Sequence, residues 1–193
     1  MIMVDVVTSL AGAELRFDDW GLDFAFAGTQ KCLALPPGLG VYAVSDRALA
    51  RAETVEERGF LYDLVKAVPD TVSGKPTATP CVPLVYALQR QLQRIHEEGL
   101  PQRWQRHRDM QARSLGWAAE RGFTPFVTEA ERRSPTISCI HAQGADVDAL
   151  AARAADAGFK MDKGYGDLKG KAFRIGHMGD HDLERLEAFL AAL

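Results

Sequence analysis

The sequence predicts an α/β fold followed by a small α+β domain, and three observations lead to this. Short apolar segments alternate with helical patterns in the first half of the chain, as in strands connected by helices. After Gly122 the patterns run strand, helix, strand, strand, helix, which describes an α+β domain of about 70 residues. The chain has 193 residues with 47% hydrophobic and 25% charged content, a globular composition with room for two domains. We expect residues 1–98 to form the larger domain, and 99–193 a connecting helix and the smaller domain.

Three apolar runs predict strands in the first part of the chain, at 2–7, 23–28 and 38–45. The first run has valine and isoleucine on both faces, which predicts a buried strand. Ser45 is a favourable N-cap residue, so a helix is expected over 45–59. Residues 68–83 contain four prolines and predict a long ordered loop without regular helix.

The second part of the chain is expected to be mainly helical at first. Two helices are predicted at 84–99 and 101–122, the second with Pro101 at its start and Gly122 at its end. The remaining elements are predicted strands at 135–142, 159–164 and 171–179 and predicted helices at 146–158 and 180–193.

Composition and charge exclude several classes of partner. A net charge of -3 and a pI near 6.0 argue against nucleic acid or an anionic membrane, and no apolar run reaches the roughly 18 residues that cross a bilayer. The three cysteines form no CxxC pair, and the start of the chain lacks a basic leader, so we expect a cytoplasmic protein with reduced thiols. The five histidines form no metal-ligand motif, and we expect them to be solvated or to cap helices.

Lys31 lies in the stretch "GTQKCLALPPGL", between a polar turn and an apolar run. An ammonium group is costly to bury, so this lysine needs either access to solvent in a surface loop or a chemical use. Asp5 lies 26 residues earlier in an apolar strand. It is either a functional carboxylate or a strand-end residue that caps the following turn through Thr8 or Ser9.

Four segments carry a resemblance to a known family: "VDVVTSLAGAELRFDDWGLDFAFAGTQKCLALPPGLGVYAVSDRAL", "TATPCVPLVYAL", "RSPTIS" and "KGKAFRIGHMGD". In this order they resemble the lysine region of the class V pyridoxal-phosphate aminotransferases, in particular the alanine or serine glyoxylate (serine-pyruvate) group. The resemblance implies the C-terminal part of a type I transferase large domain, with a mixed, mainly parallel sheet, plus a small C-terminal domain. It covers only about the C-terminal half of such an enzyme, so we expect the chain to be a fragment.

The resemblance implies roles for individual residues. Lys31 would form the Schiff base with pyridoxal 5'-phosphate, and Asp5 would pair with the pyridine nitrogen, where a carboxylate keeps the ring protonated. Gln30 and Thr29 would lie near the cofactor phosphate, since amide and hydroxyl groups suit an anion. A plain polar turn is the alternative for these two residues.

Two more residues are assigned in the same way. Thr79 matches a family threonine that reaches the phosphate of the neighbouring subunit, which implies a homodimer, although Pro76 replaces the aromatic hydroxyl that the family pattern has nearby. Arg174 alternates with Phe173 and Ile175, so it points to the opposite face of its strand. A guanidinium forks onto a carboxylate, and the family uses it for the substrate α-carboxylate. An exposed strand arginine is the alternative.

The expected function is transfer of an amino group from a small amino acid to a 2-oxo acid, with no metal. Two alternatives stay open. The chain is a non-catalytic truncated or split product that folds only as a dimer or with a missing half, or it is a cysteine desulfurase of the same class. The second is disfavoured because Gln30 stands where a histidine usually precedes the lysine, and Cys139 lies in a predicted strand core.

Overall fold

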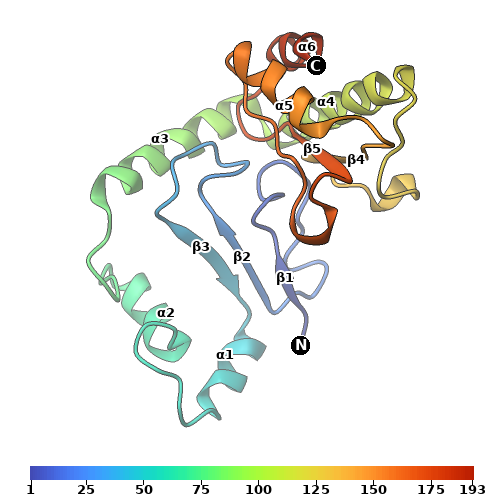
Figure 1. Ribbon diagram of the computed structural model, residues 1–193. Helices are drawn as coiled ribbons and strands as arrows, with labels where there is room; N and C mark the ends of the chain where they lie inside the picture. The colour runs from blue at the N-terminus through green and yellow to red at the C-terminus, as the bar shows by residue number, and fades with distance from the viewer. The chain divides into compact units, whose positions relative to one another are not determined.

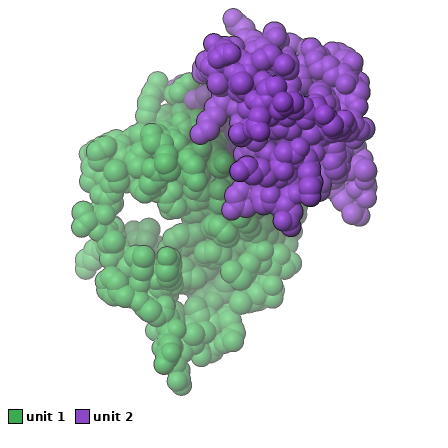
Figure 2. Space-filling model, viewed as in Figure 1, with its two compact units in different colours: residues 1–10, 15–94 green, residues 11–14, 95–193 purple.

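The computed structural model describes all residues, Met1–Leu193, and the chain forms two compact units (Figures 1 and 2). Unit 1 contains residues 1–10 and 15–94, and unit 2 contains residues 11–14 and 95–193. None of the helices combines the length and the apolar content needed to span a bilayer.

Unit 1 is built on a three-stranded sheet in the order β1-β2-β3, which confirms the three strands predicted near the N-terminus. The strands are β1 (Met3–Asp5), β2 (Phe24–Gly28) and β3 (Gly40–Val44). β1 pairs with β2 in parallel, and β2 pairs with β3 antiparallel (Figure 1). The prediction that β1 is buried is wrong. β1 has a neighbour on one side only, and Met3 is 66% exposed.

Asp23, just before β2, joins three parts of unit 1. It has no exposed surface and accepts hydrogen bonds from the backbone N–H of Ile2, the hydroxyl of Ser45 and the guanidinium of Arg47. These donors, with that of Arg47 foremost, hold the pKa of the Asp23 carboxyl well below its usual range. The start of β1, the start of β2 and the first helix therefore meet at one carboxylate.

The first helix, α1 (Asp46–Glu53), begins where Ser45 was predicted to cap it, and the Ser45 hydroxyl accepts from Ala48 N at 3.1 Å. It is shorter than the predicted 45–59. The Thr54 hydroxyl donates to Arg51 O at 2.8 Å, a local side-chain bond that competes with helix continuation.

The prediction of a continuous loop at 68–83 is wrong at both ends. α2 (Leu64–Val72) includes Pro69 and is capped by Asp63, whose carboxylate accepts from Val65 N at 3.1 Å. The exposed proline removes one backbone hydrogen bond from this short capped helix without ending it. α3 (Val82–Glu98) has Pro83 in its first turn, where no N–H is required. Only residues 73–81 connect the two helices.

Unit 2 contains three whole helices, the last residues of a fourth and a two-stranded sheet, and most of its predicted elements are confirmed. The long elements are α4 (Leu100–Glu120), β4 (Ile137–His141), α5 (Val147–Asp156), β5 (Ala172–Gly176) and α6 (Leu183–Ala192). Two short 3-10 helices, η1 (Ala130–Arg132) and η2 (Gly166–Leu168), lie between them, and the fourth helix is the end of α3. β4 and β5 pair antiparallel.

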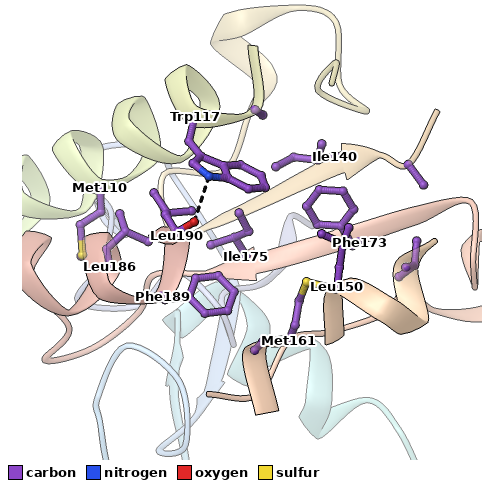
Figure 3. Close-up of a cluster of buried hydrophobic side chains, with 14 residues drawn as sticks. Met110, Trp117, Ile140, Leu150, Met161, Phe173, Ile175, Leu186, Phe189 and Leu190 are labelled. Carbon is purple, nitrogen blue, oxygen red and sulfur yellow. Dashed lines mark hydrogen bonds between the residues drawn. The ribbon is translucent and has the colours of Figure 1, made fainter. Parts of the chain in front are cut away.

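A single hydrophobic core holds unit 2 together (Figure 3). The indole of Trp117 donates to Leu190 O at 3.1 Å, and the ring stands edge-on to that of Phe173. His107 and His177 are also buried, which contradicts the expectation of solvated or capping histidines.

The predicted strand at 159–164 is wrong. Only one isolated bridge forms there, between Asp162 and Arg174. Gly164 N donates to the Asp162 carboxylate at 2.9 Å, and Gly164 has a φ of +87°, so the chain turns at once.

Candidate active site

The sheet of unit 1 brings Asp5 and the loop of Lys31 to the same edge. Asp5 is the last residue of β1 and pairs with Phe26, while β2 ends at Gly28, three residues before Lys31. Because β1 and β2 are parallel, their carboxyl ends lie side by side (Figure 1). The crevice outside the carboxyl ends of parallel strands is where α/β proteins bind ligands.

The turn that carries Lys31 is fixed by its own backbone and by Thr29. Thr29 is fully buried, and its hydroxyl donates to Pro36 O at 2.9 Å. Leu35 N donates to Thr29 O at 3.0 Å, and Ala34 N donates to Lys31 O at 2.9 Å. Lys31 thus lies at the start of a tight, internally bonded turn and not in a loose surface loop.

Cys32 ties this turn to the segment that follows Asp5. Its thiol donates to Thr8 O at 3.0 Å, and the side chains of Cys32 and Leu33 are buried. Sequence reasoning missed this contact. The signal for it was the apolar run directly after Lys31, which packs inward and leaves Lys31 at the boundary of the core.

The two charged side chains differ in their surroundings. Lys31 is half-buried, and its Nζ forms no hydrogen bond or ion pair in the structure. Asp5 is exposed, and its Oδ1 accepts from Val7 N at 2.8 Å. This is a turn-capping contact of the kind left open by the sequence, although it goes through Val7 and not through Thr8 or Ser9. The other carboxylate oxygen, Oδ2, is left for a further partner.

The remaining predicted residues of unit 1 are exposed. Gln30 lies beside Gly28, where an added Cβ would come within 2.3 Å of the Gln30 amide oxygen. Thr79 lies in the connection 73–81, and its hydroxyl forms no hydrogen bond. Gln30 and Thr79 are therefore available as donors, whereas the Thr29 hydroxyl is already bonded.

Arg174 lies in unit 2, on β5. Phe173 and Ile175 point into the core (Figure 3), so Arg174 projects from the other face of the strand. Its guanidinium makes a two-fold ion pair with Asp162, Nε to Oδ1 at 2.9 Å and Nη2 to Oδ2 at 2.6 Å. Hydrogen bonding to Asp162 raises the pKa of Arg174 further. Asp162 is the second residue that the sequence reasoning missed.

Cys139 is the register partner of Arg174 on β4 and is only partly exposed. Burial raises the pKa of its thiol, so the thiolate that nucleophilic sulfur chemistry needs is disfavoured. This argues against a desulfurase role for Cys139.

Comparisons with known proteins identify the family. A model of the family Aminotransferase class-V matches residues 1–165. The chain is 35% identical over 204 residues to the small subunit of a soluble hydrogenase from Synechococcus, covering 100% of this chain and 52% of that protein. It is 32% identical over 200 residues to a serine-glyoxylate aminotransferase from Methylorubrum extorquens, covering 100% of this chain and 50% of that enzyme.

A solved structure shows the same fold. The alanine-glyoxylate aminotransferase from Nostoc superimposes with a TM-score of 0.90 at 29% identity, covering 100% of this chain and 52% of that enzyme. The expected α/β fold is thereby confirmed, and the chain spans about half the length of the relatives it matches. This protein belongs to the class V aminotransferases, a family that depends on pyridoxal phosphate.

Proposed function

We propose that this chain carries the lysine half of an aminotransferase that moves an amino group from a small amino acid to a 2-oxo acid such as glyoxylate or pyruvate. The observation that carries the proposal is Lys31, whose amine has no partner and which follows β2 at the same sheet edge where β1 ends in Asp5. The names of the relatives from Methylorubrum extorquens and Nostoc, both glyoxylate aminotransferases, support the choice of acceptor.

The residues at this edge fit pyridoxal phosphate. Lys31 offers an amine for covalent attachment, Asp5 offers a carboxylate for the ring nitrogen, and Gln30 offers a neutral donor for the phosphate. Thr79 is not at this edge and would supply its hydroxyl to the phosphate bound by the other subunit. Thr29 is assigned a supporting role, because its hydroxyl is bonded to Pro36 and fixes the turn. When bound, the cofactor supplies a cationic ring that withdraws electrons from the substrate carbon.

Each residue then has a defined task. With the cofactor bound and the substrate amine in place of the lysine, the freed amine of Lys31 would take the proton from Cα of the amino acid and deliver it to C4′ of the cofactor, so it would serve first as base and then as acid. The carboxylate of Asp5 holds the proton on the ring nitrogen. Arg174 binds the α-carboxylate of the substrate and fixes its orientation.

The direct test is chemical trapping of the lysine. The chain is incubated with pyridoxal phosphate, reduced with borohydride and digested, and mass spectrometry locates the added cofactor. We expect the modification on Lys31 in the natural chain and in a Lys75→Ala control, which removes an exposed lysine whose side chain makes no hydrogen bond or ion pair. Lys31→Ala should lose it. Modification spread over other lysines, or absent from Lys31, would contradict the proposal.

We also propose that the active form is a homodimer in which Thr79 serves the site of the other subunit. The segment around Thr79 exposes large apolar side chains, with Tyr62 83%, Val72 85% and Tyr86 68% exposed, and such residues are typical of protein interfaces. Size-exclusion chromatography coupled to light scattering measures the oligomeric state. A monomer at micromolar concentration would exclude this arrangement and would favour a chain that functions only with the matching half.

A further inference from the structure

Arg174 is held by a carboxylate of its own chain before any substrate is present. The Asp162 carboxylate accepts hydrogen bonds from Nε and Nη2 of Arg174 at 2.9 and 2.6 Å. The backbone N–H of Arg174 donates to Asp162 O at 2.9 Å. Side chain and backbone of Arg174 are therefore both attached to the same residue.

This pairing uses one of the two bidentate edges of the guanidinium. An arginine can bind a carboxylate through Nε and Nη2 or through Nη1 and Nη2, because its five N–H groups lie in one plane. Asp162 occupies the first edge. Nη1 has no partner in the structure, and Nη2 keeps a second N–H, so the other edge is available.

Asp162 is itself fixed in place. Its Oδ1 also accepts from Gly164 N at 2.9 Å, within a turn in which Gly164 has a φ of +87°. A Cβ at Gly164 would lie 2.5 Å from Leu168 O, so the turn requires glycine. The carboxylate that holds Arg174 is thus positioned by backbone, not by a flexible contact.

We propose that Asp162 is a positioning residue, which orients Arg174 so that its Nη1–Nη2 edge faces the α-carboxylate of the amino-acid or 2-oxo-acid substrate. The inference rests on the proposed function of Arg174 as the carboxylate-binding group. Its physical basis is preorganisation. A long arginine side chain loses conformational freedom when a ligand immobilises it, and Asp162 has already restricted it. The competing possibility is that Asp162 blocks the site and that substrate must displace it.

Protection of Arg174 against phenylglyoxal distinguishes these possibilities without any need for turnover. The full chain is labelled at increasing pyruvate concentration, with pyruvamide as the neutral control, and the peptide that contains Arg174 is quantified by mass spectrometry. The exposed Arg108 serves as internal reference. The variants are Asp162→Asn, Asp162→Glu and the matched control Asp167→Asn, an exposed aspartate of the same loop without an ion pair.

We expect pyruvate, but not pyruvamide, to protect Arg174 in the natural chain and in Asp167→Asn. Asp162→Asn should require about tenfold more pyruvate, the equivalent of about 1.4 kcal/mol of lost orientation, and Asp162→Glu should recover part of the protection. Equal or stronger protection in Asp162→Asn would overturn the positioning role and leave that of Arg174 intact. No protection in the natural chain would remove Arg174 from the proposed function, and the inference with it.

Discussion

His107 and His177 are bases held without charge inside unit 2. His107 has no exposed surface, and its Nδ1 lies 2.7 Å from Arg103 O, a carbonyl that can only accept, so Nδ1 carries the proton. The Nε2 atom of His177 lies 3.0 Å from the hydroxyl of Ser138. Burial lowers the pKa of both imidazoles, to about 4 in each case.

These two groups make stability depend on pH in a known direction. In the unfolded chain the two imidazoles become protonated below their ordinary pKa of about 6.5. In the folded chain they stay neutral until the pH falls to about 4. Their stabilising contribution is therefore complete above pH 6.5 and is lost as the pH falls towards 4. Each histidine removes at most about 1.4 kcal/mol per pH unit in this window. Urea unfolding curves, followed at pH 7, 6, 5 and 4.5, measure the decline.

Two substitutions test whether the buried rings cause this decline. His107→Gln removes one titrating group, so its stability should fall less steeply between pH 6.5 and 4 even if it is lower at pH 7. His96→Gln, which changes an exposed histidine of α3, should keep the slope of the natural chain. Identical slopes in all three proteins would show that other groups are responsible.

Among the helices, α2 contains Pro69 in its interior, and we expect the helix to be more stable without it. The ring of Pro69 denies Val65 O its backbone donor, while the residue itself is exposed and makes no core contact. Pro69→Ala should stabilise unit 1 by on the order of 1–2 kcal/mol, less than the full interior cost because proline also restricts the unfolded chain. Thermal unfolding followed by far-UV circular dichroism gives the change.

The matched control for this change is Pro76→Ala, in the connection between α2 and α3. Pro76 lies outside any helix, so its replacement should leave stability the same or lower it by less than about 1 kcal/mol. A loss of stability in Pro69→Ala would mean that the proline fixes the geometry of α2 in a way that a helix former cannot.

The elements also show what local sequence can predict. Ser45 caps its helix as predicted, and Asp146 caps α5 in the same way, because a cap depends on neighbours three residues away or fewer. The exposure of β1 was missed because it depends on which strands are present to cover it. The prediction of a loop from the number of prolines was wrong at Pro69, because one missing hydrogen bond does not end a capped helix.

In the candidate site, too, some features could be predicted from local sequence and others could not. The placement of Asp5 and Lys31 at one sheet edge follows from their positions after parallel strands, and sequence could predict it. The Cys32 contact to Thr8 spans 24 residues, and the Asp162 pair with Arg174 spans 12. Neither has a local pattern, since any carboxylate in the small domain could have met Arg174. Only the fold selects Asp162.

The two units of the chain have unequal hydrophobic cores. The buried apolar cluster of unit 1 consists of Val6, Ala25 and Ala27, and the two alanines bury little surface. The cluster of unit 2 has 14 members and includes Trp117 and Phe173 (Figure 3). Stability in such a chain is not uniform, because each unit opens according to the apolar surface it buries.

Hydrogen exchange should reveal this inequality. We expect the amides of β4 to exchange at least about tenfold more slowly than those of β2, after correction for intrinsic rates, since each factor of ten corresponds to about 1.4 kcal/mol of opening free energy. Both strands have five residues, and β2 is the central strand of its sheet whereas β4 has β5 as its only strand partner, so neither strand length nor strand pairing favours β4. Exchange on the intact chain followed by digestion and mass spectrometry gives both peptides in one sample.

Equal protection of β2 and β4 would mean that the chain opens as one cooperative unit despite its separate cores. Faster exchange in β4 would show that the hydrogen bonds around Asp23 stabilise unit 1 more than the aromatic core stabilises unit 2.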